Sequence, residues 1–263
     1  MHRTKFYSAL VLVIVTVCRC TWAGEIALII DDIGNNSHDA SAFALPRDVA
    51  ISILPHKALT ARYAHLAADQ QREVLLHMPM ESMSGFKQEP EVLLASMSAK
   101  AISHRLQLAF ATVPNALGLN NHMGSRLTQL DAPMQVTMHY LQQRGLAFVD
   151  SRTTKFSQAQ SIAKTNGVVT LRRHVFLDND LDVGKIDRQF KRLLRLANKY
   201  GQALAIGHPH PQTINYLLRN LPKLGKHNIQ LIALSDMLGE IPPVEPLPEG
   251  FDSTAPAYLG TSP

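Results

Sequence analysis

Residues 25–34 read Glu-Ile-Ala-Leu-Ile-Ile-Asp-Asp-Ile-Gly, and this stretch indicates the fold of the whole chain. A short, uninterrupted apolar run such as residues 26–30 is typical of a strand buried on both faces, as in a parallel sheet. The run leads directly into the adjacent carboxylates of Asp31 and Asp32. Two neighbouring carboxylates repel each other, and a bound cation would relieve that repulsion. The alternative is a turn in which an Asp caps the next helix.

Similar apolar runs recur along the chain and alternate with longer helical patterns. The predicted strands are 26–30, 49–54, 74–76, 117–119, 147–149, 168–171, 203–206 and 229–234. The predicted helices are 56–70, 90–111, 133–144, 185–200 and 212–220. This alternation predicts an α/β fold with mostly parallel strands, and seven or eight strand–helix units in roughly 215 residues suit an irregular (β/α) barrel. A doubly wound open sheet is the alternative.

Polar and ionisable residues follow five of the predicted strands. These strand ends are Asp31-Asp32, His77 to Glu81, Asn120 to Ser125, Asp150 to Arg152, and His208 to His210. In a parallel barrel all such ends lie on one face, where the active sites of these folds are found. Asp, Glu and His gathered on that face predict a metal site with acid and base partners.

Each strand end also has a simpler interpretation. The alternative for His77 is a structural histidine buried under a loop. The alternative for Asp150 and Arg152 is a structural ion pair. His208 and His210 flank a proline that stiffens their loop, so that one can act while the other is exposed. The combination favours function, because five polar strand ends are hard to attribute to chance.

The two ends of the chain differ from the rest. Residues 1–23 combine a basic start with an apolar run of about 13 residues and then small residues, the pattern of a secretory signal peptide; an uncleaved anchor is the rival interpretation. Both cysteines, Cys18 and Cys20, lie in this segment, so the mature chain has no thiol ligand or nucleophile. Residues 24–240 are predicted to form a single domain, and residues 241–263 a flexible proline-rich tail.

Composition excludes several classes of protein. Apolar residues make up 46% and charged residues 18% of the 263 residues, which excludes wholesale disorder. The formal charge is +5, and three of the basic residues that contribute to it lie in the signal segment. No run of basic residues is longer than two, so nucleic acid is not an expected partner. We also expect no stable membrane insertion once the signal is cleaved. The chain has no Gly-rich phosphate loop and no Gly-x-Ser-x-Gly motif, which disfavours nucleotide binding and serine hydrolysis.

Five ordered motifs carry a family resemblance. They are Ile-Ile-Asp31-Asp32-Ile-Gly, Leu-Leu-His77-Met-Pro-Met-Glu81, Asn121-His122-Met-Gly-Ser, Val-Asp150-Ser-Arg152-Thr and Ile-Gly-His208-Pro-His210. Together they resemble the divergent polysaccharide deacetylase family, a remote branch of the NodB-like carbohydrate esterases. The resemblance runs from about Glu25 to Met237 and implies an irregular (β/α) barrel that uses a divalent metal, with zinc as the expected ion.

The resemblance also implies roles for individual residues. Asp31 matches the general base, Asp32 a metal ligand and His208 the general acid. The family's pair of histidines four residues apart is missing, because Glu81 follows His77 at that spacing and Arg126 follows His122. We therefore predict a rebuilt ligand set of Asp32, His77 and His122. The residues predicted to bind or orient substrate are Glu81, Asn121, Asp150, Arg152 and His210, with Glu81 also a substitute ligand or a partner of one.

These inferences predict a hydrolase that removes acetyl groups from an envelope polysaccharide, with peptidoglycan as a candidate substrate. The signal places it across the inner membrane, which is the periplasm in a Gram-negative cell. A non-catalytic glycan- or protein-binding module on the same barrel is the main alternative, favoured by the missing histidine pair. A metal-dependent phosphodiesterase is a third, disfavoured by the scarcity of Lys and Arg near the strand ends.

Overall fold

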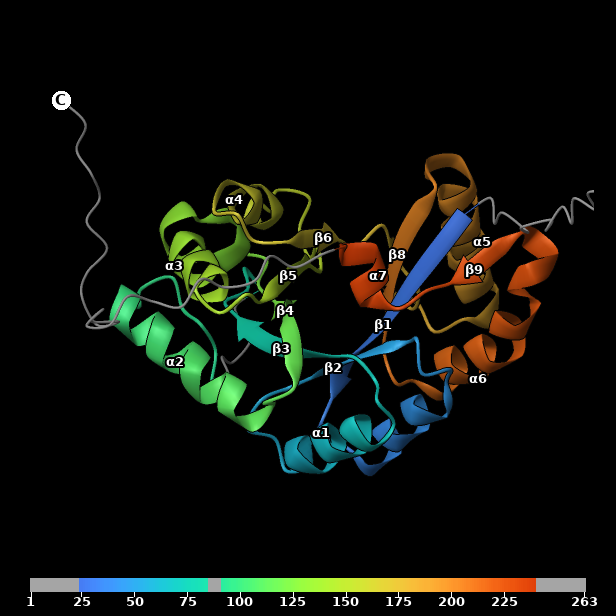
Figure 1. The fold of residues 1–263 in the computed structure, drawn as a ribbon, viewed down its shortest axis with the longest axis horizontal. Helices are drawn as coiled ribbons and strands as arrows, with labels where there is room; N and C mark the ends of the chain where they lie inside the picture. Colours follow the sequence, from blue (N-terminus) through green and yellow to red (C-terminus); the bar gives the residue numbers. More distant parts are fainter. Residues whose placement is uncertain (1–23, 85–90, 240–263) are drawn as a thin grey trace, which may run out of the picture.

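The computed structural model describes residues 24–84 and 91–239, which form one sheet of parallel strands surrounded by helices (Figure 1). The strands are β1 (Gly24–Ile33), β2 (Ala50–Ile53), β3 (Val74–Met80), β4 (Ala116–Met123), β5 (Ala147–Asp150), β6 (Thr170–Arg172), β7 (Val175–Phe176), β8 (Gln202–Gly207) and β9 (Ile229–Leu231). Their order is β6-β5-β4-β3-β2-β1-β8-β7, with β9 paired to the start of β1. Among the described strands, β6 and β7 end this path without pairing to each other. The expected single-domain α/β barrel is therefore confirmed, as an incompletely closed one.

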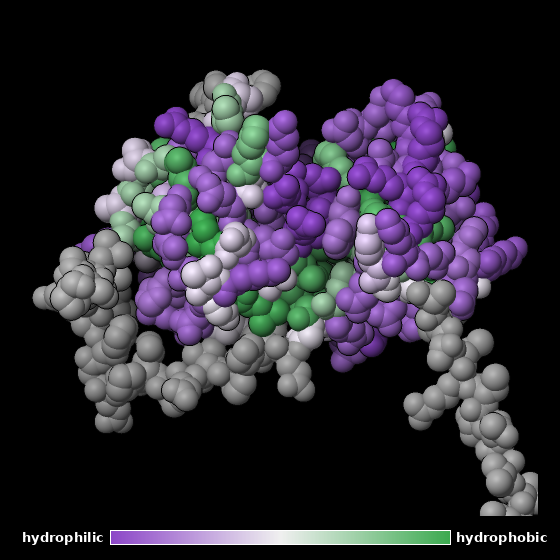
Figure 2. Space-filling model, turned by 90° about the horizontal axis from the view of Figure 1, so that it is seen from above, coloured by the Kyte–Doolittle hydropathy of each residue, from purple (hydrophilic) through white to green (hydrophobic). Residues whose placement is uncertain are grey.

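Helices α1 to α6 lie outside the curved sheet, and the short α7 lies against its inner side (Figure 1). They are α1 (Thr60–Asp69), α2 (Ala99–Thr112), α3 (Asp131–Gln142), α4 (Ala159–Thr165), α5 (Val183–Tyr200), α6 (Pro211–Asn220) and α7 (Leu234–Leu238), with short 3-10 helices η1 (Ser37–Ala44), η2 (Leu127–Gln129) and η3 (Leu221–His227). Seen from above, most of the surface is hydrophilic (Figure 2). Helices that bury one apolar stripe against a sheet leave their polar sides to solvent in this way.

Strand β1 is buried on both faces, as its apolar run predicts. Ile26, Leu28 and Ile30 pack in the large core between sheet and helices. Ala27 and Ile29 belong to a smaller core inside the barrel. The division follows from the alternation of side chains along a strand.

The inner core is closed at one end by α7. Leu234 and Met237 of this short helix pack in the inner cluster. The carboxylate of Glu73, which directly precedes β3, accepts hydrogen bonds from the backbone N–H groups of Leu234 and Ser235. Helix α7 therefore lies at the end of the barrel where the strands begin, opposite Asp31 and Asp32.

Helix α5 shows how sequence pattern and packing correspond. Its buried side chains, Ile186, Phe190, Leu193, Leu194 and Ala197, recur at the three- and four-residue intervals of one helical face. Asp182 caps the first turn by accepting a hydrogen bond from Lys185 N–H at 2.9 Å. The helix ends at Gly201, whose φ of 84° favours glycine.

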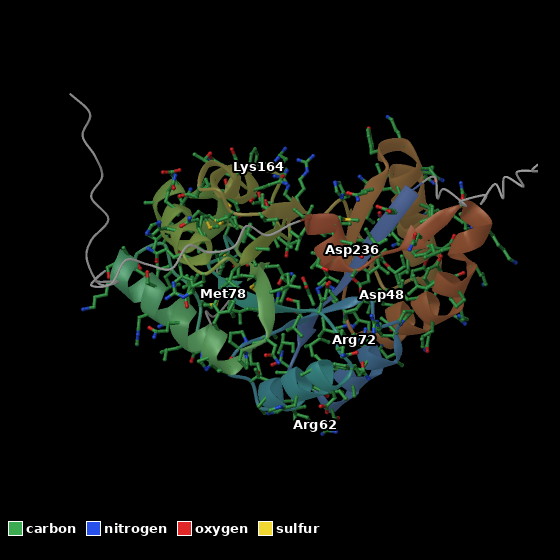
Figure 3. The ribbon with its side chains drawn as sticks, viewed as in Figure 1. Asp48, Arg62, Arg72, Met78, Lys164 and Asp236 are labelled. Carbon is green, nitrogen blue, oxygen red and sulfur yellow. The ribbon has the colours of Figure 1, made fainter. Side chains whose placement is uncertain are left out.

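Arg72 ties the segment before β2 to the rest of the barrel (Figure 3). Its guanidinium group donates hydrogen bonds to the backbone carbonyls of Phe43, Leu45, Pro46 and Val49, at 2.8 to 3.3 Å. The side chain is 6% exposed. A buried guanidinium with several carbonyl acceptors keeps its charge solvated by the protein.

Several predicted boundaries differ from the structure. The helix predicted from residue 90 begins at Ala99, because Leu93 instead pairs with β3: its N–H donates to Pro79 and its carbonyl accepts from Glu81. The strand predicted over 229–234 ends at Leu231, and Leu234 is instead the first residue of α7. Strand β7, helix α4 and the 3-10 helices were not predicted, because elements this short show little periodicity.

The predicted signal peptide (1–23) and proline-rich tail (241–263) lie outside the described residues. Within the described ranges, none of the helices combines the length and hydropathy that a membrane span requires.

Candidate metal centre and active site

The carboxyl ends of four strands bring five ionisable side chains together. Asp31 and Asp32 lie near the end of β1, His77 in β3 and His122 in β4, and His208 directly follows β8. Strands β1, β3, β4 and β8 lie within one continuous parallel sheet, so their ends meet on one face. The sequence predicted this grouping.

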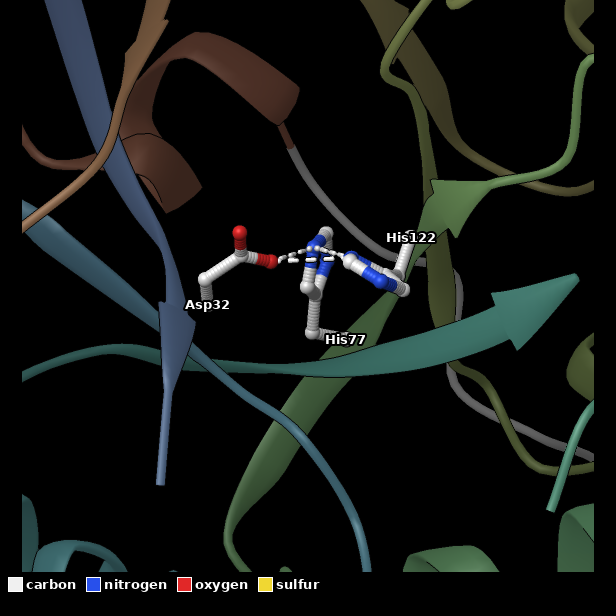
Figure 4. A group of neighbouring side chains, drawn as sticks. All are labelled: Asp32, His77 and His122. Carbon is white, nitrogen blue, oxygen red and sulfur yellow. Dashed lines mark hydrogen bonds and ion pairs between the residues drawn. The ribbon is translucent and has the colours of Figure 1, made fainter. Parts of the chain in front are cut away.

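Asp32, His77 and His122 form the centre of the group (Figure 4). Asp32 Oδ1 lies 3.0 Å from His77 Nε2 and 2.8 Å from His122 Nδ1. The two imidazole nitrogens are 3.2 Å apart. Each residue thus points one ligand-type atom at the same small volume.

A local irregularity in β1 lets two consecutive carboxylates face the same site. Neighbouring residues of a regular strand point to opposite faces. Here the β1–β2 register shifts between Ile30 and Ile33, and Asp32 has a φ of 61°. This left-handed conformation is costly for a residue other than glycine and occurs mainly where structure or function requires it. It turns Asp32 toward His77, which also lies 3.7 Å from Asp31.

Burial and the facing imidazoles shift the pKa values of the two carboxylates in opposite directions. Burial raises the pKa of Asp31, with His77 and His208 opposing. For Asp32, burial alone would raise the pKa, but the close imidazoles of His122 and His77 outweigh it and lower the pKa. Asp32 is therefore the stronger acid of the pair, and Asp31 is the stronger base.

His208 is held by an aspartate that was not predicted. Asp178 follows the two-residue strand β7, and its Oδ1 lies 3.0 Å from His208 Nδ1. Its Oδ2 accepts hydrogen bonds from His208 N–H and the Thr213 hydroxyl, both at 2.7 Å. Burial alone would lower the pKa of His208, but Asp178 outweighs it and raises the pKa to about 9. His208 Nε2 lies 3.7 Å from Asp32 Oδ2, so a protonated imidazole faces the site.

Asn120 is the second side chain that was not predicted. It is fully buried in β4. Its Oδ1 lies 2.8 Å from His77 Nδ1, and its Nδ2 donates to Asp31 Oδ1 at 2.8 Å. One amide therefore contacts both a carboxylate and an imidazole of the site.

Comparison with known proteins decides the family. A family model described as divergent polysaccharide deacetylase matches residues 28–238. The chain belongs to this family. An uncharacterized protein of Haemophilus influenzae is 41% identical over 217 residues, covering 81% of this chain and 76% of that protein. The uncharacterized protein YibQ of Escherichia coli is 36% identical over 222 residues, covering 83% and 68%.

Solved structures share the deacetylase-like fold. The uncharacterized protein ATU2773 from Agrobacterium tumefaciens superposes with a TM-score of 0.78 at 24% identity, over 81% of this chain and 89% of that chain. BA3943 from Bacillus anthracis, described as a CE4 family pseudoenzyme, superposes with a TM-score of 0.53 at 12% identity, over 82% and 66%. At such identities these similarities show the fold alone.

Two predicted substrate residues of this deacetylase-family chain are held by the protein itself. Glu81 forms an ion pair with Arg126 at 2.9 Å and accepts a hydrogen bond from the N–H of Ala95 at 2.6 Å. It does not belong to the ligand-type group of Asp32, His77 and His122 among the described residues. Asn121 is buried, and its amide binds the carbonyl of Met123 and the N–H of Ser151. Neither geometry supports substrate contact, which stays a prediction for both.

Asp150 and Arg152 shape their own loop, and their side chains do not form the ion pair that was the alternative interpretation. Asp150 accepts hydrogen bonds from Arg152 N–H at 2.8 Å and the Ser157 hydroxyl at 2.7 Å. The guanidinium group of Arg152 donates to the carbonyls of Lys155 and Ser157, each at 3.1 Å. Their role toward substrate stays a prediction.

His210 is exposed beside His208, with the ring centres 6.0 Å apart. Its position leaves it accessible to a ligand. This agrees with the expectation that one histidine of the pair is exposed.

The residues present fit a divalent metal. Asp32 Oδ1 is buried and accepts no hydrogen bond of acceptable geometry in the described part of the chain, although two imidazole nitrogens lie within 3.0 Å. His77 Nδ1 faces a carbonyl-type oxygen of Asn120, which leaves Nε2 to carry a lone pair. Two imidazole nitrogens and one carboxylate oxygen form a donor set typical of catalytic zinc.

Proposed function

We propose that this protein is a zinc-dependent hydrolase that removes acetyl groups from an envelope polysaccharide. The observation that carries the proposal is the convergence of Asp32, His77 and His122 on one point, flanked by Asp31 and His208. Membership of the deacetylase family supports the substrate class. Peptidoglycan is the specific substrate we put forward, because the chain starts with a secretory signal pattern. The periplasm of a Gram-negative cell is the corresponding compartment.

The chain's own residues divide the work of hydrolysis. Asp32, His77 and His122 would hold the ion, which supplies Lewis acidity toward the acetyl carbonyl and makes a bound water more acidic. Asp31 Oδ2 accepts the proton that the attacking water loses. His208 donates a proton to the leaving nitrogen or oxygen, so that acetate and a free amine or hydroxyl result. Asp178 keeps His208 protonated until that step.

Metal content tests the site directly. The exported protein is purified as wild type, Asp32→Ala and His122→Ala, and its metal is measured by mass spectrometry before and after incubation with zinc. We expect about one zinc per chain in the wild type and loss of zinc in both variants. His139→Ala, which removes an exposed imidazole from α3, is the matched control and should keep the metal.

Acetate release from N- and O-acetylated glycans, peptidoglycan included, tests the reaction. Asp31→Asn and His208→Ala should keep the zinc and lose at least 100-fold in rate. A wild type that stays metal-free and binds glycan regardless of chelator would replace the hydrolase with the non-catalytic binding module. The missing histidine pair is the observation that favours that alternative.

A further inference from the structure

The buried amide of Asn120 links two parts of the site. Its Oδ1 accepts hydrogen bonds from the Ser52 hydroxyl and, at 2.8 Å, from His77 Nδ1. Its Nδ2 donates to Asp31 Oδ1 at 2.8 Å and to Ser151 Oγ at 3.3 Å. Every hydrogen-bonding position of the amide is therefore used.

The chemistry of the partners fixes which way the amide points. A carboxylate only accepts hydrogen bonds, so the NH₂ group must face Asp31. The carbonyl oxygen then faces His77, and it too only accepts. His77 must consequently carry a proton on Nδ1, which leaves Nε2, the atom 3.0 Å from Asp32, as the nitrogen that can offer a lone pair to an ion.

We propose that Asn120 is a positioning residue for both the metal and the proton acceptor of this site. It holds His77 in the Nδ1–H tautomer, so that Nε2 is free to bind the ion. It holds Asp31 through Oδ1, so that Oδ2 stays free to take a proton. The inference rests on the metal site of the proposed function and adds a residue whose chemistry requires an amide.

Other side chains cannot replace this amide. An aspartate at position 120 could accept from His77 but, as a carboxylate, could not donate to Asp31. An alanine could do neither and would remove a hydrogen-bond partner from four buried polar groups, those of Asp31, Ser52, His77 and Ser151. Outer partners of metal-binding histidines usually change metal affinity 10- to 100-fold when removed.

Zinc affinity tests the first half of the proposal. The dissociation constant is measured by competition with a chelator for wild type, Asn120→Ala and Ser52→Ala. We expect Asn120→Ala to bind zinc about 10- to 100-fold more weakly. Ser52→Ala is the matched control, because it removes a hydrogen bond to the same Asn120 oxygen but keeps the hydrogen bonds of Asn120 to His77 and Asp31. Its dissociation constant for zinc should stay within about threefold of wild type. Equal losses in the two variants, or none in Asn120→Ala, would overturn the proposal.

Nitrogen NMR of the zinc-loaded protein tests the tautomer. Wild type should show a protonated, slowly exchanging Nδ1 on His77, and Asn120→Ala should lose that signal. A wild-type His77 that binds zinc through Nδ1 would contradict the proposal. If the alanine variant fails to fold, Asn120→Asp replaces it: the variant should keep zinc affinity within about threefold, since the acceptor for His77 remains.

Asn120→Asp also tests the second half. Loss of the donor releases Asp31 Oδ1 from its fixed position, so kcat for acetate release should fall at least tenfold while KM stays within about threefold. An unchanged kcat would remove Asp31 from the proposal. Because zinc affinity and tautomer are measured without turnover, a protein that binds zinc and hydrolyses nothing would defeat the proposed function and leave this inference intact.

Discussion

Gly118 lies where the backbone of β4 passes close to that of β5, and Gly118→Ala should disturb both the stability of the fold and the proposed metal site. A Cβ atom built at Gly118 lies 2.3 Å from the carbonyl oxygen of Ala147 and 2.8 Å from its carbonyl carbon. Ordinary contacts of this kind begin at 3.4 Å, so the two backbones must move apart by about 1 Å. No rotamer change can relieve the clash, because both partners are backbone atoms.

The displacement reaches the site along a single strand. Asn120 and His122 follow Gly118 in β4, and the β4–β5 pairing runs from Gly118 to Asn120. Overpacking of this kind costs about 1 to 3 kcal/mol of unfolding free energy. A shift of about 1 Å in a positioned catalytic group can cost about 100-fold in rate. We expect a loss of about 2 kcal/mol in stability and at least a tenfold weaker affinity for zinc.

Urea unfolding of the metal-free protein and zinc competition measure the two effects separately. Gly184→Ala is the control: it makes the same change in the first turn of α5, where the new Cβ meets the Asp182 carboxylate at 3.2 Å and no backbone atom. That variant should stay within about 0.5 kcal/mol of wild type. A Gly118→Ala protein that is equally stable and binds zinc equally well would refute the argument that this close contact positions the site.

Two further predictions concern His208 and Glu81. Burial lowers the pKa of His208, but Asp178 outweighs it and raises the pKa to about 9. The protonated imidazole therefore stabilises the fold fully below the ordinary histidine pKa of about 6.5, and this stabilisation is lost as the pH rises through 9. In urea unfolding of metal-free protein, the stability advantage of wild type over Asp178→Asn should shrink by up to about 3 kcal/mol between pH 6.5 and 10; a constant difference would contradict the assignment. Glu81→Gln should bind zinc within about threefold of wild type, because Arg126 and a backbone N–H already engage the carboxylate; a tenfold loss would place Glu81 in the ligand set.

The fold was largely predictable because the strands are apolar on both faces. A run such as 26–30 can only be buried between two layers, and β1 is divided between an outer and an inner core. Strand β7 has two residues, helix α7 has five and helix α4 has seven, and none of the three was predicted, because each carries too few residues to show a period. Such elements exist because neighbouring elements supply their hydrogen bonds and packing.

The site was predictable wherever its residues follow strands that the sequence pattern identifies. Polar residues at recognised strand ends did converge, and Asp32, His77 and His122 lie together as expected, although their role as ligands stays a prediction. Asp178 was not predicted, because it follows β7, a strand too short to be recognised in the sequence. The family motif points to Asn121, which adjoins His122, and not to Asn120. In the structure β4 extends to Met123, and it is Asn120, two residues before His122, that contacts Asp31 and His77.

The same extension of β4 explains how a site can form without histidines four residues apart. Four residues of a strand span about 13 Å, too far for two side chains to share one ion. Here the two histidines come from neighbouring strands, where His77 pairs with Asn120 and Pro79 with His122. The positions four residues further along hold Glu81 and Arg126, which bind each other at 2.9 Å. Strand pairing thus replaces sequence spacing, and the arrangement of Asp32, His77 and His122 depends on the β3–β4 register together with the irregularity at Asp32.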